Sequence, residues 1–186
     1  MLNMDFSQRV VIETGSQNWV ASPSQGVWRK PLEREAKESG HVTSVVKYEA
    51  GSRFSPHLHP YGEEIFVLDG VFSDENGDYP AGSYLRHPPG SQHAPFSEKG
   101  CVILVKLNQF DPNDLKTVRI NTGETEWLPS IGGLQVMPLH DFKHEHVALV
   151  KWPKGEKFQP HMSEHFPFVE EETVIWVKTG HFPLGS

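Results

Sequence analysis

Residues 51–70 read GSRFSPHLHPYGEEIFVLDG, and this stretch decides the fold and the chemistry expected of the chain. His57 and His59 are separated by one residue, so on an extended strand their side chains point to the same face. Glu63 follows a Pro-Tyr-Gly turn signal, which can return its carboxylate to the same place. The stretch therefore predicts a strand and a turn that gather two imidazoles and one carboxylate.

A second stretch, residues 82–96, reads GSYLRHPPGSQHAPF and carries a third histidine. His93 follows a Pro-Gly turn that begins a returning strand, so it can complete a ligand shell from across a barrel. Three neutral imidazoles and one carboxylate suit Zn, Fe, Ni, Cu or Mn, with one or two positions left for water or substrate. We therefore predict one divalent metal ion, held by His57, His59, Glu63 and His93.

Neighbours of these four residues leave alternatives open. Glu64 could replace Glu63 as the ligand, but adjacent residues on a strand face opposite sides, and Glu63 fits the spacing better. Four further side chains flank the predicted ligands and could line a substrate pocket or stand at the barrel rim: Arg53, Tyr61, Arg86 and Phe96.

The two stretches together resemble the two conserved motifs of the cupin superfamily, over most of residues 44–106. The resemblance implies an all-β fold, a cupin-type β-barrel (jelly-roll), with a metal on the four predicted residues. A narrower resemblance, to the cupin domain of ChrR-type anti-sigma factors, rests on Gly-Glu-Glu at 62–64 and on segments 72–75 and 79–84. It implies zinc as the metal, with Fe, Ni or Mn as alternatives, in the sensory half of a regulator.

The narrower resemblance supports two functions of different classes. The first is a ChrR-like regulatory or sensing module. The sequence shows no counterpart of that regulator's sigma-binding half, a helical zinc module with Cys-x-x-Cys, so no sigma factor is expected to bind this chain alone. The alternative is a metal-dependent dioxygenase that cleaves a small diketone or aryl ketone, an activity found among related cupins. The sequence does not choose between them.

Short strands broken by glycine and proline dominate the rest of the chain. The best helical candidate, residues 32–39, is polar and makes at most one or two turns. Glu-Asn-Gly-Asp at 75–78 predicts a hairpin with a type I′ turn. Strand patterns cover residues 8–13, 42–49, 64–68, 71–73, 102–107, 117–120, 146–152 and 173–178.

The chain also repeats itself, which predicts a tandem duplicated barrel, or bicupin. The matching segments are 10–15 with 118–123, 31–32 with 138–139, 45–57 with 149–161, and 91–110 with 163–182. The offset falls from 104 to 72, so the second lobe lacks about 32 residues of the repeat. We predict a metal-binding lobe at 1–112 and an abbreviated lobe at 113–186. Either the second lobe has lost this segment or the sequence is incomplete there. A true loss of about four strands would leave unpaired sheet edges, which proteins normally cover or close.

Several histidines and one cysteine lie outside the predicted metal site and are considered as further functional residues. His161 and His165 match first-lobe positions, but two ligands rarely hold a metal alone, so no full second site is expected. Cys101 precedes an apolar run and is interpreted as a small buried strand residue rather than a nucleophile. One histidine group is interpreted as a polar loop: His140, His144 and His146.

Composition narrows the partners and the location. The 186 residues carry 17 basic and 24 acidic side chains, a net charge of −7, which argues against a nucleic-acid partner. No apolar run approaches the roughly 20 residues that a membrane helix needs, and residues 1–9 lack the apolar core of a signal peptide. A cytoplasmic protein is expected, with a small-molecule ligand or substrate and with a homodimer as one possibility.

Overall fold

The computed structural model describes residues 1–36, 40–155 and 171–180. Within these ranges the chain forms strands and one three-residue 3-10 turn, η1 (Ile131–Gly133), which confirms the all-β class. Two compact units divide the chain, Met1–Gly123 and Glu124–Ser186. None of the described residues form a helix that is long and apolar enough to cross a membrane. The cytoplasmic location stays a prediction.

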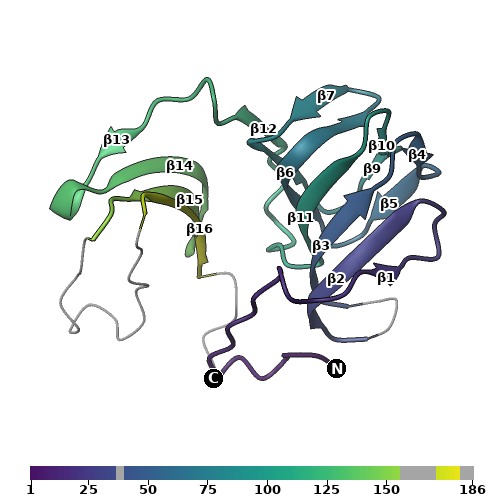
Figure 1. The fold of residues 1–186 in the computed structure, drawn as a ribbon, viewed down its shortest axis with the longest axis horizontal. Coiled ribbons are helices and arrows are strands. Elements are labelled where there is room, and N and C mark those ends of the chain that lie inside the picture. The colour runs from purple at the N-terminus through teal and green to yellow at the C-terminus, as the bar shows by residue number, and fades with distance from the viewer. Residues whose placement is uncertain (37–39, 156–170, 181–186) are drawn as a thin grey trace. The chain divides into compact units, whose positions relative to one another are not determined.

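The first unit is an antiparallel, curled sheet built around β6, which pairs with four other strands (Figure 1). From β6 the sheet continues through β11, β3 and β2 to β1, while β8 lies on the other side of β6 and carries β12. A separate two-stranded sheet pairs β5 with β9. The strands of this unit are β1 (Val20–Ala21), β2 (Val27–Arg34), β3 (Val42–Tyr48), β4 (Ser52–Arg53), β5 (His57–His59), β6 (Glu63–Asp74), β7 (Gly77–Pro80), β8 (Ser83–His87), β9 (Ser91–His93), β10 (Phe96–Ser97), β11 (Cys101–Leu107) and β12 (Val118–Asn121).

Alternating side chains on these strands build the apolar core. On β11, Cys101, Ile103 and Val105 are buried, while the residues between them are only partly buried. This is the period-two pattern of a strand with one face on a core. Burial raises the pKa of the Cys101 thiol to about 11, so Cys101 is the inert strand residue that its sequence context predicts.

A buried ion-pair network lies on the face of β6 that carries Glu64. Arg86 on β8 is fully buried and lies 2.9 Å from Glu64 and 2.7 Å from Asp114. The Tyr84 hydroxyl also donates to Glu64, and the Phe110 ring lies 3.9 Å from the guanidinium carbon of Arg86. Glu64 is therefore committed to this network, on the opposite side of the strand from Glu63.

Removing the cation at the centre of this network should destabilise the fold. Arg86→Met leaves the buried carboxylates without Arg86, and we expect the free energy of unfolding to fall by about 3–5 kcal/mol in denaturant titrations. The matched control is Arg53→Met, because Arg53 pairs with Glu98 at the exposed surface. That change should cost less than about 1 kcal/mol. Equal losses in both variants would contradict the role given to Arg86.

Several secondary-structure predictions differ from the structure, among them the two strands predicted at 64–68 and 71–73, which form the single strand β6. Residues 32–34 belong to strand β2 rather than to a helix, because Glu33 and Arg34 pair with β3 and Leu32 lies in the bulge before them. Residues 8–13 form no strand, although β12 (Val118–Asn121), within the matching repeat segment, does. The hairpin between β6 and β7 is present, but Asn76 has no positive φ, so the turn is not type I′.

The second unit contains a four-stranded antiparallel sheet in the order β13-β14-β15-β16. Its strands are β13 (Leu128–Pro129), β14 (Gln135–Phe142), β15 (Glu145–Trp152) and β16 (Thr173–Thr179). Strands β14, β15 and β16 pair in the same register as β2, β3 and β11 of the first unit. The irregularity in β14, between Pro138 and His140, matches the one in β2 between Pro31 and Glu33.

The division between the compact units lies at Gly123–Glu124, later than the predicted lobe boundary near residue 112. The physical reason is strand pairing, because β12 pairs along its whole length with β8 of the first unit. Duplication of one lobe to give the other stays a proposal, which the shared register supports.

Candidate metal centre

Strand pairing brings the two histidine-bearing stretches together. β5 and β9 pair antiparallel with His57 directly opposite His93. The ring centroids of His57 and His59 are 4.8 Å apart, and those of His57 and His93 are 5.3 Å apart. The imidazoles predicted to share one ion therefore lie within reach of a common point.

Glu63, the first residue of β6, completes the group. Its Oε2 atom lies 3.4 Å from Nε2 of His59 and 3.1 Å from Nε2 of His93. His59, Glu63 and His93 are buried, whereas His57 is half-buried. The structure thus places all four predicted residues in one cluster.

The donor atoms of this cluster fit a metal ion. Nε2 of His59 and both ring nitrogens of His93 are buried without a well-directed hydrogen bond to any described residue. Nδ1 of His57 lies 2.9 Å from the Ser55 carbonyl oxygen, which leaves Nε2 of His57 for a ligand. Buried polar atoms of this kind are costly unless something binds them. Three imidazole nitrogens and a carboxylate oxygen are suitable donors for a divalent transition metal.

The electrostatics of the cluster favour a positive charge. Burial lowers the pKa of His59 to about 4, so this ring is neutral at physiological pH. Burial alone would raise the pKa of Glu63, but its contacts with His87 and His93 outweigh that effect and hold it well below its usual range. Burial also opposes a charge on His93, yet Asp74 and Glu63 raise its pKa to about 9. The carboxylates thus attract a cation at His93.

His87 and Asp74 also belong to the cluster, and sequence reasoning missed both. Nδ1 of His87 lies 3.0 Å from Oε2 of Glu63, and Nε2 lies 3.7 Å from Oδ2 of Asp74. Oδ2 of Asp74 also lies 3.5 Å from Nδ1 of His93. No local signal marks His87, because all five residues of β8 are buried and its place opposite Glu63 is set by the pairing of β6 with β8.

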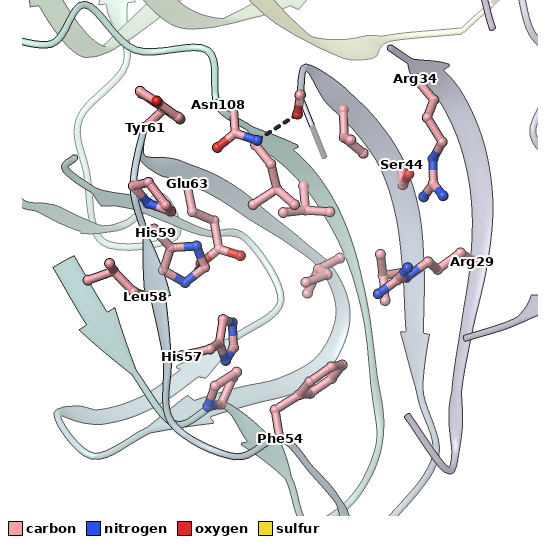
Figure 2. Close-up of a pocket in the computed structure, with 18 of the residues that line it drawn as sticks. Arg29, Arg34, Ser44, Phe54, His57, Leu58, His59, Tyr61, Glu63 and Asn108 are labelled. Carbon is pink, nitrogen blue, oxygen red and sulfur yellow. Dashed lines mark hydrogen bonds and ion pairs between the residues drawn. The ribbon is translucent and has the colours of Figure 1, made fainter. Parts of the chain in front are cut away.

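The cluster lies at one side of a pocket of about 440 Å³ (Figure 2). His57, His59 and Glu63 contribute to its lining, and Tyr61 lies beside them. Apolar residues form much of the remaining surface: Val42, Val46, Phe54, Leu58, Ile103, Val105 and Leu107. A volume of this size lies within the range of small-molecule sites.

The other residues singled out in the sequence lie elsewhere. Of the four flanking side chains, only Tyr61 lines the pocket; Arg53 stacks on Phe96, and Arg86 is buried in its ion-pair network. His161 and His165 lie outside the described residues.

The histidine group of the second unit does not form the polar loop expected. His140 and His146 are on paired strands, and His144 is in the turn between them. His140 is buried and pairs with Val147, whereas His146 is exposed and pairs with Asp141. The two strand histidines therefore face opposite sides of the sheet.

A family comparison agrees with this architecture. The model of the ChrR Cupin-like domain family matches residues 7–111, more than half of the chain. The chain therefore belongs to the ChrR Cupin-like domain family, and its β-barrel is of the cupin type.

Several solved structures are similar to this chain at low sequence identity. A putative dioxygenase from Nostoc punctiforme PCC 73102 is 18% identical with a TM-score of 0.58, covering 70% of this chain and 53% of that chain. The protein Ylba from E. coli is 14% identical with a TM-score of 0.59, covering 82% and 70%. The complex of Rhodobacter sphaeroides SigE with the anti-sigma ChrR gives 22% identity and a TM-score of 0.43, covering 51% of each chain.

The similarities to the putative dioxygenase and to Ylba show the fold alone. The chain spans about half the length of the dioxygenase and of the ChrR complex chain. No curated protein sequence matches the chain.

Two overlapping groups of residues in the cluster could hold a metal, and the zinc affinities of two variants show which group does. One contains His57, His59 and His93, and the other contains Glu63, His87 and His93. If His87 only orients Glu63, then His57→Ala should weaken zinc binding more than His87→Ala does, measured by competition with a chelating dye. Loss of an orienting partner typically costs about 10–100-fold in affinity. A larger loss in His87→Ala would assign the metal to the second group.

The choice of carboxylate is tested by a matched pair of variants. Glu63→Gln should lower zinc affinity by more than about tenfold, because a neutral amide is a weaker ligand, while the fold remains. Glu64→Gln should destabilise the fold but leave the metal content of the folded protein unchanged. Elemental analysis of both folded variants gives the readout. Full metal content in Glu63→Gln would remove Glu63 from the set of ligands.

Proposed function

We propose that the first unit binds one divalent metal ion together with a small molecule in the adjoining pocket. The metal would be held by His57, His59, Glu63 and His93. The observation that carries the proposal is the coincidence of this cluster with the pocket wall, since three of the four side chains line it. A ligand in the pocket would therefore lie beside the metal.

Each residue of the cluster has a defined task in this proposal. Three imidazoles supply neutral nitrogen donors, and the Glu63 carboxylate offsets part of the charge of the ion. His87 fixes Glu63 through its Nδ1 contact, and Asp74 lies against Nδ1 of His93. Such outer contacts orient ligands and tune their basicity. When bound, the metal would supply a Lewis-acidic centre, and zinc is the first candidate by resemblance to ChrR-type domains.

The function we favour is a regulatory or sensing module in which the metal and the pocket together recognise a small molecule. Membership of the ChrR Cupin-like family supports this function. A sigma factor is not proposed as a partner of this chain alone. A homodimer stays a prediction from the sequence.

A metal-dependent dioxygenase that cleaves a small diketone or aryl ketone is the second candidate. The observation that favours it is the pocket itself, which is large enough for such a substrate and adjoins the half-buried His57. The fold shared with the putative dioxygenase from Nostoc punctiforme is compatible with this candidate.

Elemental analysis of protein purified without added metal tests the first claim. We expect about one divalent ion per chain, removable by a strong chelator with a fall in melting temperature, because ligand binding stabilises the native state. A metal content near zero, with no stabilisation by added Zn²⁺, Fe²⁺ or Mn²⁺, would end the proposal.

Oxygen uptake separates sensor from enzyme. Protein loaded anaerobically with Fe²⁺ is mixed with pentane-2,4-dione or an aryl diketone, and O₂ consumption is followed with an electrode. The sensing function predicts no uptake above that of the Glu63→Gln variant. Multiple turnovers that depend on Glu63 would instead establish the dioxygenase.

A further inference from the structure

A second polar group lies on the pocket wall opposite the histidines. Arg29 and Arg34 come from β2, and Ser44 comes from β3. Figure 2 shows the two arginine side chains and Ser44 on one side of the pocket, facing His57, His59 and Glu63 on the other. Nothing in the proposed metal centre requires these three residues.

A β-bulge places both arginines on the same wall. Residues five apart on a regular strand face opposite sides. In β2 the register shifts between Pro31 and Glu33, so Arg29 pairs with Val46 and Arg34 pairs with Val42. Val42 and Val46 both line the pocket, and directly paired residues share a face of the sheet. The extra residue therefore turns Arg34 to the pocket side.

Ser44 adds an unsatisfied hydroxyl at the same place. Its side-chain oxygen is buried and has no hydrogen-bond partner among the described residues, and the residue is 1% exposed. Ser44 pairs with Pro31, midway along the register between the two arginines. A buried hydroxyl without a partner costs free energy unless a ligand or water supplies one.

The fold does not require this polar group. The second unit repeats the same strands, register and bulge, and there Val136 and Asp141 occupy the positions equivalent to Arg29 and Arg34. Ala148 occupies the position of Ser44. The same strand pattern therefore forms with two uncharged side chains and an acid at these positions.

We propose that Arg29, Arg34 and Ser44 form a carboxylate-binding subsite, so that the ligand is a small organic acid. Guanidinium groups bind carboxylates with two parallel hydrogen bonds, and the serine hydroxyl donates one more. Apolar side chains separate this wall from the metal cluster, which fits a short hydrocarbon body. Among the residues that line the pocket, Glu63 is the acidic one, and it lies on the wall opposite the two arginines (Figure 2).

This inference rests on the proposed function only for the metal end of the ligand. The remainder of the ligand follows from the lining: a carboxylate at the arginines, an apolar middle, and a carbonyl or hydroxyl oxygen toward the metal cluster. A 4-oxo acid such as 4-oxopentanoate has this pattern, and 4-oxopentanamide is its uncharged counterpart of almost the same shape.

Calorimetric titration of the zinc-loaded chain with these two compounds tests the subsite. We expect 4-oxopentanoate to bind at least about tenfold more tightly than 4-oxopentanamide, since a charge-assisted pair of hydrogen bonds is worth about that factor. In Arg29→Gln and Arg34→Gln the preference should shrink severalfold, and in the double variant it should vanish. Ser44→Ala should weaken binding of the acid by about threefold to tenfold. Melting temperatures identify any variant that does not fold, and Ser44→Ala and Arg29→Lys then carry the test.

The control is Arg53→Gln, which removes one surface charge outside the pocket and should leave the preference unchanged. Equal preference in all variants, binding of the amide as tight as that of the acid, or no binding of either compound would overturn the subsite. Tighter binding of inorganic phosphate than of the acid would also overturn it, in favour of a phosphate site. Metal content, measured on the same samples, reports separately on the proposed function. A chain without metal that still prefers the acid would refute the metal centre and keep the subsite.

Discussion

The pairing of β5 with β9 is the contact on which the site depends. These two short strands come from stretches about thirty residues apart, and their register sets His57 opposite His93. Glu63 then enters the cluster as the first residue of β6, the strand around which the first unit is built. A local loss of this pairing would separate the imidazoles even if the rest of the sheet stayed intact.

The adjacent residues Glu63 and Glu64 have different roles, one in the candidate metal centre and one in the fold. Glu63 faces the imidazoles, and Glu64 faces Arg86 in a fully buried ion-pair network. Buried ion pairs of this kind add less stability than their short distances suggest, because both charges lose their hydration. They do penalise any slip in register, since a shift by one residue would exchange the two carboxylates.

Much of the fold and the candidate ligand set could be predicted from the sequence because they depend on local spacing. Two histidines one residue apart must share a strand face, and a turn signal before Glu63 or His93 brings the chain back toward them. His87 was missed because its place depends on the register between β6 and β8, which no local pattern reveals. Residues 32–34 were read as helical because their polar composition conceals the pairing with β3. Likewise, the sequence could not predict that Arg29 and Arg34 share one wall of the pocket, because this depends on the bulge in β2.

That bulge has a consequence for comparing relatives. A single extra residue in β2 decides which side chains reach the pocket, so an alignment that puts a gap one position away would assign Arg34 to the wrong column. Substitution scores alone would then hide a change of ligand chemistry between close homologues. The two units show how much such side chains can differ on one strand pattern: by register, Glu33 of the first unit corresponds to His140 of the second, and Arg34 corresponds to Asp141. Strand register is therefore a safer guide than residue identity when this pocket wall is compared with that of a relative.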